Sequence, residues 1–140
     1  MYTTPTTTAG TLKMTDEELK ALTLADLIGI PYKDGGRDLA GLDCYGLAII
    51  AVYLITGKKL RDVSYTSHDE ELSNKLAPTL NVRKTAEIKA GNIIEMTFNK
   101  EIHIGVIINA REFIHATYNM GVKLSQIKTT LINNIYEVVN

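Results

Sequence analysis

An uninterrupted run of uncharged residues, Cys44–Thr56 (CYGLAIIAVYLIT), is the strongest constraint on how this chain folds. Gly57 and two lysines follow it, and a glycine beyond the last turn with cations nearby is typical of a helix C-terminus. A helix that is apolar on all sides is a buried one. A buried strand is the alternative, because Ile49–Ile55 is rich in β-branched residues, but the length and the terminal signals favour a helix. We predict a central helix over residues 44–56, with Asp43 or Cys44 at its N-terminus.

A second helix is predicted nearer the N-terminus, at about residues 16–28. Thr15 fits the helix N-cap, and Glu18 completes a capping box three residues later. Apolar residues recur at roughly helical spacing through this stretch, and Gly29 and the proline after it end the pattern. Residues 31–43 (PYKDGGRDLAGLD) are rich in glycine and aspartate and predict a loop that leads into the central helix.

The pattern changes in the second half of the chain. Residues 60–90 are polar, with one short helical candidate at 68–77. Short apolar runs separated by turn residues then predict five antiparallel strands: Ile93–Phe98, Ile102–Ile108, Glu112–Tyr118, Val122–Gln126 and Asn133–Val139. Helices first and strands second predict an α+β fold, with N-terminal helices packed on a five-stranded antiparallel sheet.

The length of 140 residues suits a single domain, which we place at 14–140 after a flexible arm at 1–13. Fifteen basic residues balance sixteen acidic ones, so no electrostatic argument favours nucleic acid or an anionic membrane as a partner. The longest apolar run is too short to cross a bilayer, and the threonine-rich start does not resemble a signal peptide. We therefore expect a soluble protein that is made in the cytoplasm.

Cys44 is the sole cysteine, and it is the first candidate for chemistry. A buried cysteine is often an inert small hydrophobe. However, Cys44 lies at a predicted helix N-terminus, where backbone N–H groups and the helix dipole stabilise a thiolate. It also follows a glycine-rich loop, and Gly46 leaves little bulk around the sulfur. These features predict a nucleophile.

His103 and His115 are the next candidates, because a register argument brings them together. If Asn109-Ala110-Arg111 is the loop of a hairpin, Ile108 faces Glu112, and counting inward Gly105 faces His115. The two histidines then share one face of the sheet as diagonal neighbours, with room above Gly105 for the His115 ring to lean toward His103. That is the arrangement of a base with an orienting partner. Either histidine could instead be structural, and a loop of another length would break the pairing.

The loop before Cys44 supplies further candidates. Tyr32 could donate its hydroxyl to an oxyanion, alongside the backbone N–H of Cys44, or could be a packed loop residue. Asp43 fits a helix cap and could also bind a substrate ammonium group. Arg37 is interpreted as a solvated loop charge. A zinc site built from Cys44 and the two histidines is a further alternative.

These residues match a known family. Residues 27–50 (LIGIPYKDGGRDLAGLDCYGLAII) resemble the N-terminal signature of NlpC/P60 cysteine peptidases, a tyrosine before a Gly-Gly loop and then Asp-Cys-x-Gly-Leu opening a helix. Residues 101–108 (EIHIGVII) resemble the strand with that family's catalytic histidine. Residues 112–117 (EFIHAT) resemble the next strand, which carries the third polar residue, and a Gly-Val pair follows at 121–122.

The resemblance implies a papain-like fold in which Cys44 is the nucleophile, His103 the general base and His115 its orienting partner, with Tyr32 near the oxyanion. It implies hydrolysis of peptidoglycan stem peptides at the γ-D-glutamyl bond to a diamino acid, with no cofactor or metal. Tyr45 stands where the family usually has a serine that helps to hold the stem peptide, so the resemblance implies that Tyr45 is a substrate-binding residue.

Asp-Cys-Tyr-Gly without a signal peptide looks more like the phage-tail branch of the family. Membership of that branch implies phage tail proteins as partners and a virion component that reaches the cell wall by infection. The alternative function is a catalytically silent tail assembly protein that retains the fold.

Overall fold

The computed structural model describes residues 12, 14–62, 81–98 and 100–139. The predicted arm at 1–13 lies outside the described residues apart from Leu12, which packs against the core. The predicted short helix at 68–77 also lies outside them.

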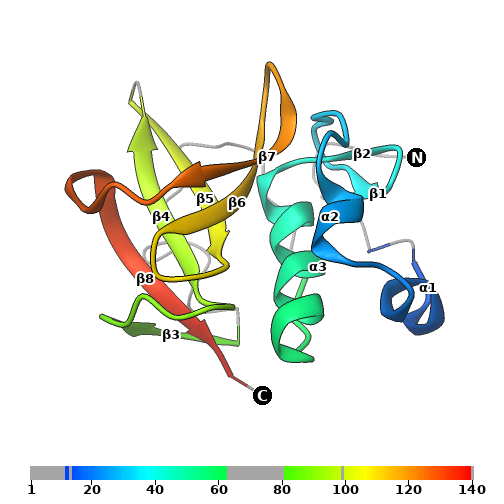
Figure 1. Ribbon diagram of the computed structural model, residues 1–140, viewed down its shortest axis with the longest axis horizontal. Helices are drawn as coiled ribbons and strands as arrows, with labels where there is room; N and C mark the ends of the chain where they lie inside the picture. The colour runs from blue at the N-terminus through cyan, green and yellow to red at the C-terminus, as the bar shows by residue number, and fades with distance from the viewer. Residues whose placement is uncertain (1–11, 13, 63–80, 99, 140) are drawn as a thin grey trace, which may run out of the picture.

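Helix α3, Cys44–Thr56, is the centre of the molecule, as the sequence predicts. Asp43 is its N-cap, and Gly57 ends it in the left-handed conformation with φ of 77°, which glycine adopts without a Cβ clash. Its first nine residues are all buried. Figure 1 shows why: α3 lies with the large sheet on one side and the N-terminal elements on the other.

The predicted helix over residues 16–28 is wrong as a continuous element. The structure has two short helices, α1 at Asp16–Lys20 and α2 at Leu24–Leu27. The predicted capping box of Thr15 and Glu18 is confirmed at the start of α1. Thr23 interrupts the helix because its backbone N–H donates to the Asp26 carboxylate at 2.8 Å, which begins a second helix.

Within the described residues, the main sheet has six antiparallel strands in the order β3-β8-β4-β5-β6-β7. Five match the predicted strands within a residue or two, at Ile93–Phe98 (β4), Glu101–Ile107 (β5), Glu112–Thr117 (β6), Gly121–Gln126 (β7) and Ile132–Val138 (β8), with a short 3₁₀ turn, Thr129–Leu131, before the last. The sixth, β3 at Val82–Thr85, lacks a buried apolar face, so its sequence carries no strand signal. The α+β class is confirmed.

Each face of the sheet has its own apolar cluster. Ile104, Val106 and Ile114 belong to the main cluster around α3, whereas Ile107 and Phe113 belong to a smaller cluster that also contains Met96. Because side chains alternate along a strand, His103 lies on the same face of β5 as Ile107, and His115 lies on the same face of β6 as Phe113. Strands β5 and β6 pair at Val106–Ile114 and Ile107–Phe113. His103 precedes these paired residues on β5, and His115 follows them on β6.

Candidate active site

The loop before α3 folds tightly over the first turn of that helix. It contains a two-stranded ribbon, β1 at Arg37–Asp38 and β2 at Gly41–Leu42. A Cβ on Gly36 would meet the Gly41 backbone, and a Cβ on Gly46 would meet the Gly36 carbonyl. The glycines are therefore required by the close approach of the loop to the start of α3.

Asp43 fixes the loop and the helix together. Its Oδ1 accepts hydrogen bonds from the Gly46 backbone N–H and from Arg37 Nη1, both at 2.7 Å, and its Oδ2 accepts one from the Gly35 N–H at 3.0 Å. The predicted role as a helix cap is confirmed. The carboxylate is buried and faces protein donors, so this geometry supports the cap rather than the predicted contact with a substrate ammonium group.

Arg37 corrects the interpretation of a solvated loop charge. It is only 2% exposed, and its guanidinium lies between the carboxylates of Asp43 and Asp62 and over the ring of Tyr45. Burial of a cation without such partners would be costly. The sequence gives no signal for this placement, because Arg37 and Asp62 are far apart along the chain.

Tyr45 also differs from its prediction as a residue that holds the substrate. Its side chain is 1% exposed, and its hydroxyl donates to the backbone carbonyl of Arg61. Because the ring fills the core behind the first turn of α3, Tyr45 does not line the cleft described below. Its place in the structure is that of a core residue with a satisfied hydroxyl.

Cys44 begins α3 and faces strand β5. Backbone N–H groups of Ile104, which directly follows His103, and of Cys44 itself lie near enough to the sulfur to favour its thiolate. The residue is 7% exposed. Burial and the neighbouring Asp43 carboxylate raise the pKa of the thiol to about 12, although the backbone N–H groups and Arg37 act in the opposite direction. The predicted thiolate stabilisation by the helix N-terminus is thus outweighed, and the free protein holds a protonated thiol.

The two histidines meet as the register argument predicts. Val106 pairs with Ile114, which is the register in which Gly105 faces His115. His103 Nε2 lies 2.7 Å from His115 Nδ1, and the two rings meet at 75°. A Cβ on Gly105 would lie 3.1 Å from the Cβ of His115 and 2.6 Å from Phe113 Cδ2, so only glycine leaves the space that the His115 ring uses.

His115 is held on its other side by β7. Its Nε2 lies 2.7 Å from Ser125 Oγ, and its ring packs on Phe113 with centroids 4.5 Å apart. Burial, then the His103 ring and Lys123, lower the pKa of His115 to about 3, so the imidazole is neutral. Sequence reasoning missed Ser125. Extending the hairpin register to the third strand would have found it, because Ser125 pairs with Phe113 two residues from His115.

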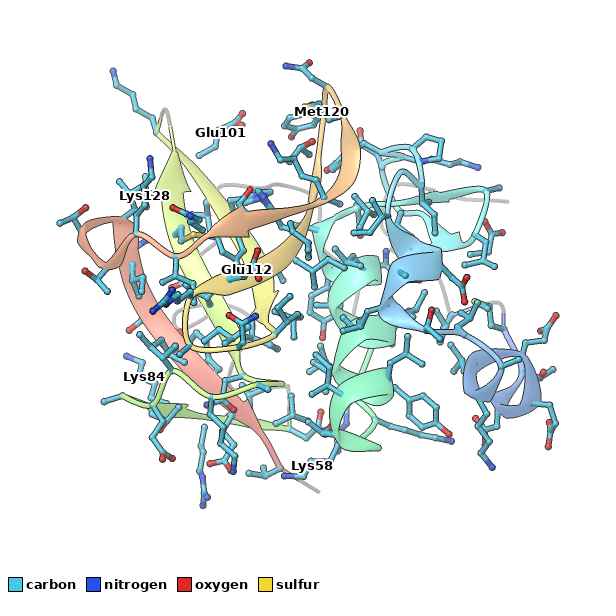
Figure 2. All side chains as sticks on the ribbon, in the orientation of Figure 1. Lys58, Lys84, Glu101, Glu112, Met120 and Lys128 are labelled. Carbon is cyan, nitrogen blue, oxygen red and sulfur yellow. The ribbon has the colours of Figure 1, made fainter. Side chains whose placement is uncertain are left out.

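A cleft of about 390 Å³ opens beside the histidine pair. Tyr32 lies in its wall, with its ring 4.5 Å from that of Tyr118. Burial, and next the proximity of Cys44, raise the pKa of the Tyr32 phenol, which keeps it a neutral donor. Glu101 and Met120 line the mouth, and Figure 2 shows both projecting from the same end of the sheet. The cleft therefore contains the predicted Tyr32, His103 and His115.

The geometry is not that of a metal centre. Among the residues that the structure describes, no three acidic, histidine or cysteine side chains are grouped to hold a metal ion. The two imidazoles face each other at hydrogen-bond distance, and Ser125 occupies the remaining nitrogen of His115. In the described part of the chain, no helix has the length and apolar character to cross a membrane.

A buried helix that begins at a cysteine, packed on an antiparallel sheet with a histidine pair beside a cleft, defines an α+β domain with a candidate cysteine–histidine site. The comparison with protein families identifies the family of this domain. The model of the NlpC/P60 family matches residues 29–139, from the loop before Cys44 to the end of the sheet. The chain therefore belongs to the NlpC/P60 family.

Individual proteins of this family are similar to the chain. A Haemophilus influenzae protein described as "Probable endopeptidase NlpC homolog" is 27% identical over 71% of this chain, which spans 49% of that protein's length. Among solved structures, the NlpC/p60 domain of the peptidoglycan hydrolase SagA is similar, with a TM-score of 0.56, 21% identity, and coverage of 81% of this chain and 92% of that one.

A second solved structure, the P60 domain of an antigen from M. avium subspecies paratuberculosis, has a TM-score of 0.52 and 14% identity. It covers 81% of this chain and 87% of the other. At these identities the two structures establish the fold, and the family model carries the assignment.

Proposed function

We propose that the chain is a cysteine peptidase that hydrolyses peptide bonds in the stem peptides of peptidoglycan through a Cys44 thioester. The family assignment and the relatives described as an endopeptidase and a peptidoglycan hydrolase support the substrate class. The observation that carries the proposal is local. The backbone N–H of Ile104 acts on the Cys44 thiol and lowers its pKa, and Ile104 is one residue beyond the histidine whose Nε2 meets His115.

The proposed chemistry is acyl transfer with His103 as general base. His103 takes the proton of the Cys44 thiol as the sulfur attacks the scissile carbonyl. The raised pKa of the thiol makes this proton transfer part of the attack, because little thiolate exists beforehand. His103, now an imidazolium, gives its proton to the leaving amine. Water then hydrolyses the thioester, with His103 again as base, and releases the acid and the free thiol.

The negative oxygen formed during attack needs donors near the sulfur. The backbone N–H of Cys44 lowers the pKa of its own thiol, and Tyr32, whose hydroxyl stays neutral, lies in the wall of the cleft. We assign both to the oxyanion. His115 accepts from the imidazolium N–H of His103 and thereby supports its positive charge.

The deciding experiment is mass spectrometry of peptidoglycan fragments after incubation with the protein. Wild type should release peptides cut within the stem, whereas Cys44→Ala and His103→Ala should release none. Replacement of His68, the third histidine in the sequence, is the matched control and should leave cleavage unchanged. Thermal unfolding of each variant separates loss of chemistry from loss of fold. Cleavage by Cys44→Ala at the wild-type rate would reject the proposal.

One observation favours a second candidate function. Cys44 is only 7% exposed and is not among the residues that line the cleft, as expected if the cleft binds a partner without turnover. The protein would then be a catalytically silent phage tail assembly component that retains the fold. The Asp-Cys-Tyr-Gly sequence suggests an association with phage tails for the active peptidase as well. The same fragments decide: wild type that binds purified peptidoglycan but releases no peptides supports the silent tail protein.

A further inference from the structure

The hydrogen-bond contacts of the histidine pair continue beyond His115 to a third side chain, Ser125 on β7. His103 Nε2 meets His115 Nδ1 at 2.7 Å, and His115 Nε2 meets Ser125 Oγ at the same distance. The three side chains come from β5, β6 and β7, three adjacent strands of the sheet. The chain of contacts is fixed by rigid elements rather than by loops.

We propose that Ser125 is a positioning residue that selects the tautomer of His115, and through it the nitrogen with which His103 takes the thiol proton. The inference rests on the proposed function for its kinetic consequences. Its structural content, which ring nitrogen carries the proton, stands independently of any activity.

The argument begins with the protons of two neutral imidazoles, each of which has one N–H. If His103 carries its proton on Nε2, that N–H donates to His115 Nδ1, and His103 Nδ1 has the lone pair that a general base needs. His115 must then carry its own proton on Nε2, where Ser125 Oγ accepts it. In the opposite arrangement, His115 Nδ1–H donates to His103, whose proton moves to Nδ1 and whose base function is lost.

Ser125 favours the first arrangement because it gives the Nε2–H of His115 an acceptor in a buried place. Without a hydroxyl there, this N–H would be unpaired, and the tautomer would shift toward Nδ1–H. Ser125 also lines a second cavity, of about 450 Å³, together with Met96 and Phe113. The hydroxyl proton of Ser125 can therefore point into this cavity, away from the His115 ring, which leaves the oxygen free to accept from His115 Nε2–H.

The preference of His115 for the Nε2–H tautomer is strongest when His103 is positively charged. After taking the thiol proton, His103 has N–H groups on both nitrogens, so His115 Nδ1 can only accept. A second proton on His115 is opposed by burial, by the His103 ring and by Lys123, which stands directly opposite it in the β6–β7 register. His115 is thus neutral with its proton on Nε2, and Ser125 is the group that holds it there.

The test compares Ser125→Thr with Ser125→Val, which differ only in a hydroxyl against a methyl and share the β-branch that strands favour. The Thr variant should keep kcat within about twofold of wild type. The Val variant should lose about three- to tenfold in kcat, as expected for one lost hydrogen bond, with KM unchanged. Thr85→Val, at the other edge of the sheet on β3, removes a hydroxyl that accepts from Glu87 and should leave kcat unchanged.

A spectroscopic measurement makes the inference independent of turnover. In protein with ¹⁵N-labelled histidine, the ring nitrogens of His115 should report the Nε2–H tautomer in wild type and in Ser125→Thr. In Ser125→Val, the Nδ1–H form should become populated. Wild type with its proton on Nδ1 overturns the inference, and so do equal kcat and equal tautomers in the Thr and Val variants. Wild type that shows Nε2–H but no hydrolysis rejects the proposed function alone. If neither variant folds, the wild-type spectrum still decides.

Discussion

Arg37 Nη1 lies 2.7 Å from Asp43 Oδ1, and both side chains are almost completely buried directly behind Cys44. The carboxylate caps the helix that carries the sulfur, but its charge also raises the pKa of the thiol. Arg37 offsets part of this effect, because a cation nearby favours the thiolate. The ion pair therefore lets one residue cap the helix without adding a full negative charge beside the Cys44 sulfur.

Arg37→Met should destabilise the fold strongly, because it leaves a buried carboxylate without its cation. Breaking one side of a buried pair costs about 3–5 kcal/mol, which urea denaturation would measure as a lower free energy of unfolding. Arg83→Met is the matched control. Its ion pair with Glu137 is at the surface, with the Arg83 side chain 68% exposed, and such pairs contribute little to stability. Equal losses in the two variants would contradict a structural role for the buried pair.

Gly105→Ala should lower activity more than stability explains. The new Cβ would press on Phe113 and on the Cβ of His115, so the His115 ring must move away from His103. Overpacking of this kind costs about 1–3 kcal/mol. In Gly57→Ala nothing lies within 4 Å of the new Cβ, but φ of 77° strains it. This control should lose about 1 kcal/mol and keep its kcat. A Gly105→Ala variant with wild-type kcat would mean that the ring position is not critical.

The sequence was sufficient for the parts of the fold that depend on local signals. An uncharged run of this length with Asp43 before it and Gly57 after it favours a buried helix over a buried strand, and α3 has those bounds. The three-residue loop at 109–111 fixed the β5–β6 register, and from it the meeting of His103 and His115. Where a hydrophobic pattern or a turn length determines the structure, the position of each residue follows from its place in the sequence.

The sequence was insufficient where distant residues decide. From the sequence Arg37 is interpreted as a loop charge, because nothing in it indicates that Asp62 lies beside the guanidinium. Tyr45 is likewise interpreted as a substrate contact, whereas in the structure its hydroxyl donates to the carbonyl of Arg61. Strand β3 has no apolar face of its own and exists because β8 pairs with it. The depth of Cys44, and hence its raised pKa, depends on the whole packing of the loop over α3.

Acid should weaken the fold through His115. Its pKa is about 3 in the folded protein, below its ordinary value of 6.5, so the unfolded chain binds this proton more readily. The stabilising contribution of the neutral ring is present above pH 6.5 and is lost as the pH falls toward 3. In His115→Gln this contribution is absent, while the other titrating groups are retained. The difference in free energy of unfolding between wild type and His115→Gln should become less favourable to wild type between pH 7 and pH 4. A difference independent of pH would contradict the lowered pKa.

Alkylation of Cys44 should have a pH profile shifted to alkaline values. Iodoacetamide reacts with the thiolate, and the pKa of the folded thiol is about 12 against an ordinary value of 9.0. The rate should rise about tenfold for each pH unit from 7 to 10 without levelling off. In urea-unfolded protein the rate for the same thiol should reach half of its maximum near pH 9.0, its ordinary pKa, and level off above that pH. A plateau below pH 8 in folded protein would indicate a preformed thiolate, and His103 would then not act as general base in the attack.

Replacement of His115 should distinguish a hydrogen-bond acceptor from a space-filling ring. The Oδ1 of asparagine is as many bonds from the backbone as the Nδ1 that accepts from His103, so His115→Asn can keep that contact. His115→Leu fills similar volume without an acceptor, and its kcat should fall further than that of His115→Asn. Both should keep more activity than His103→Ala, because an orienting residue contributes less than the base itself. Peptide release from peptidoglycan, timed for each variant, gives the order. If the Leu and Asn variants are equal, the contact at 2.7 Å between the two histidines does not support catalysis.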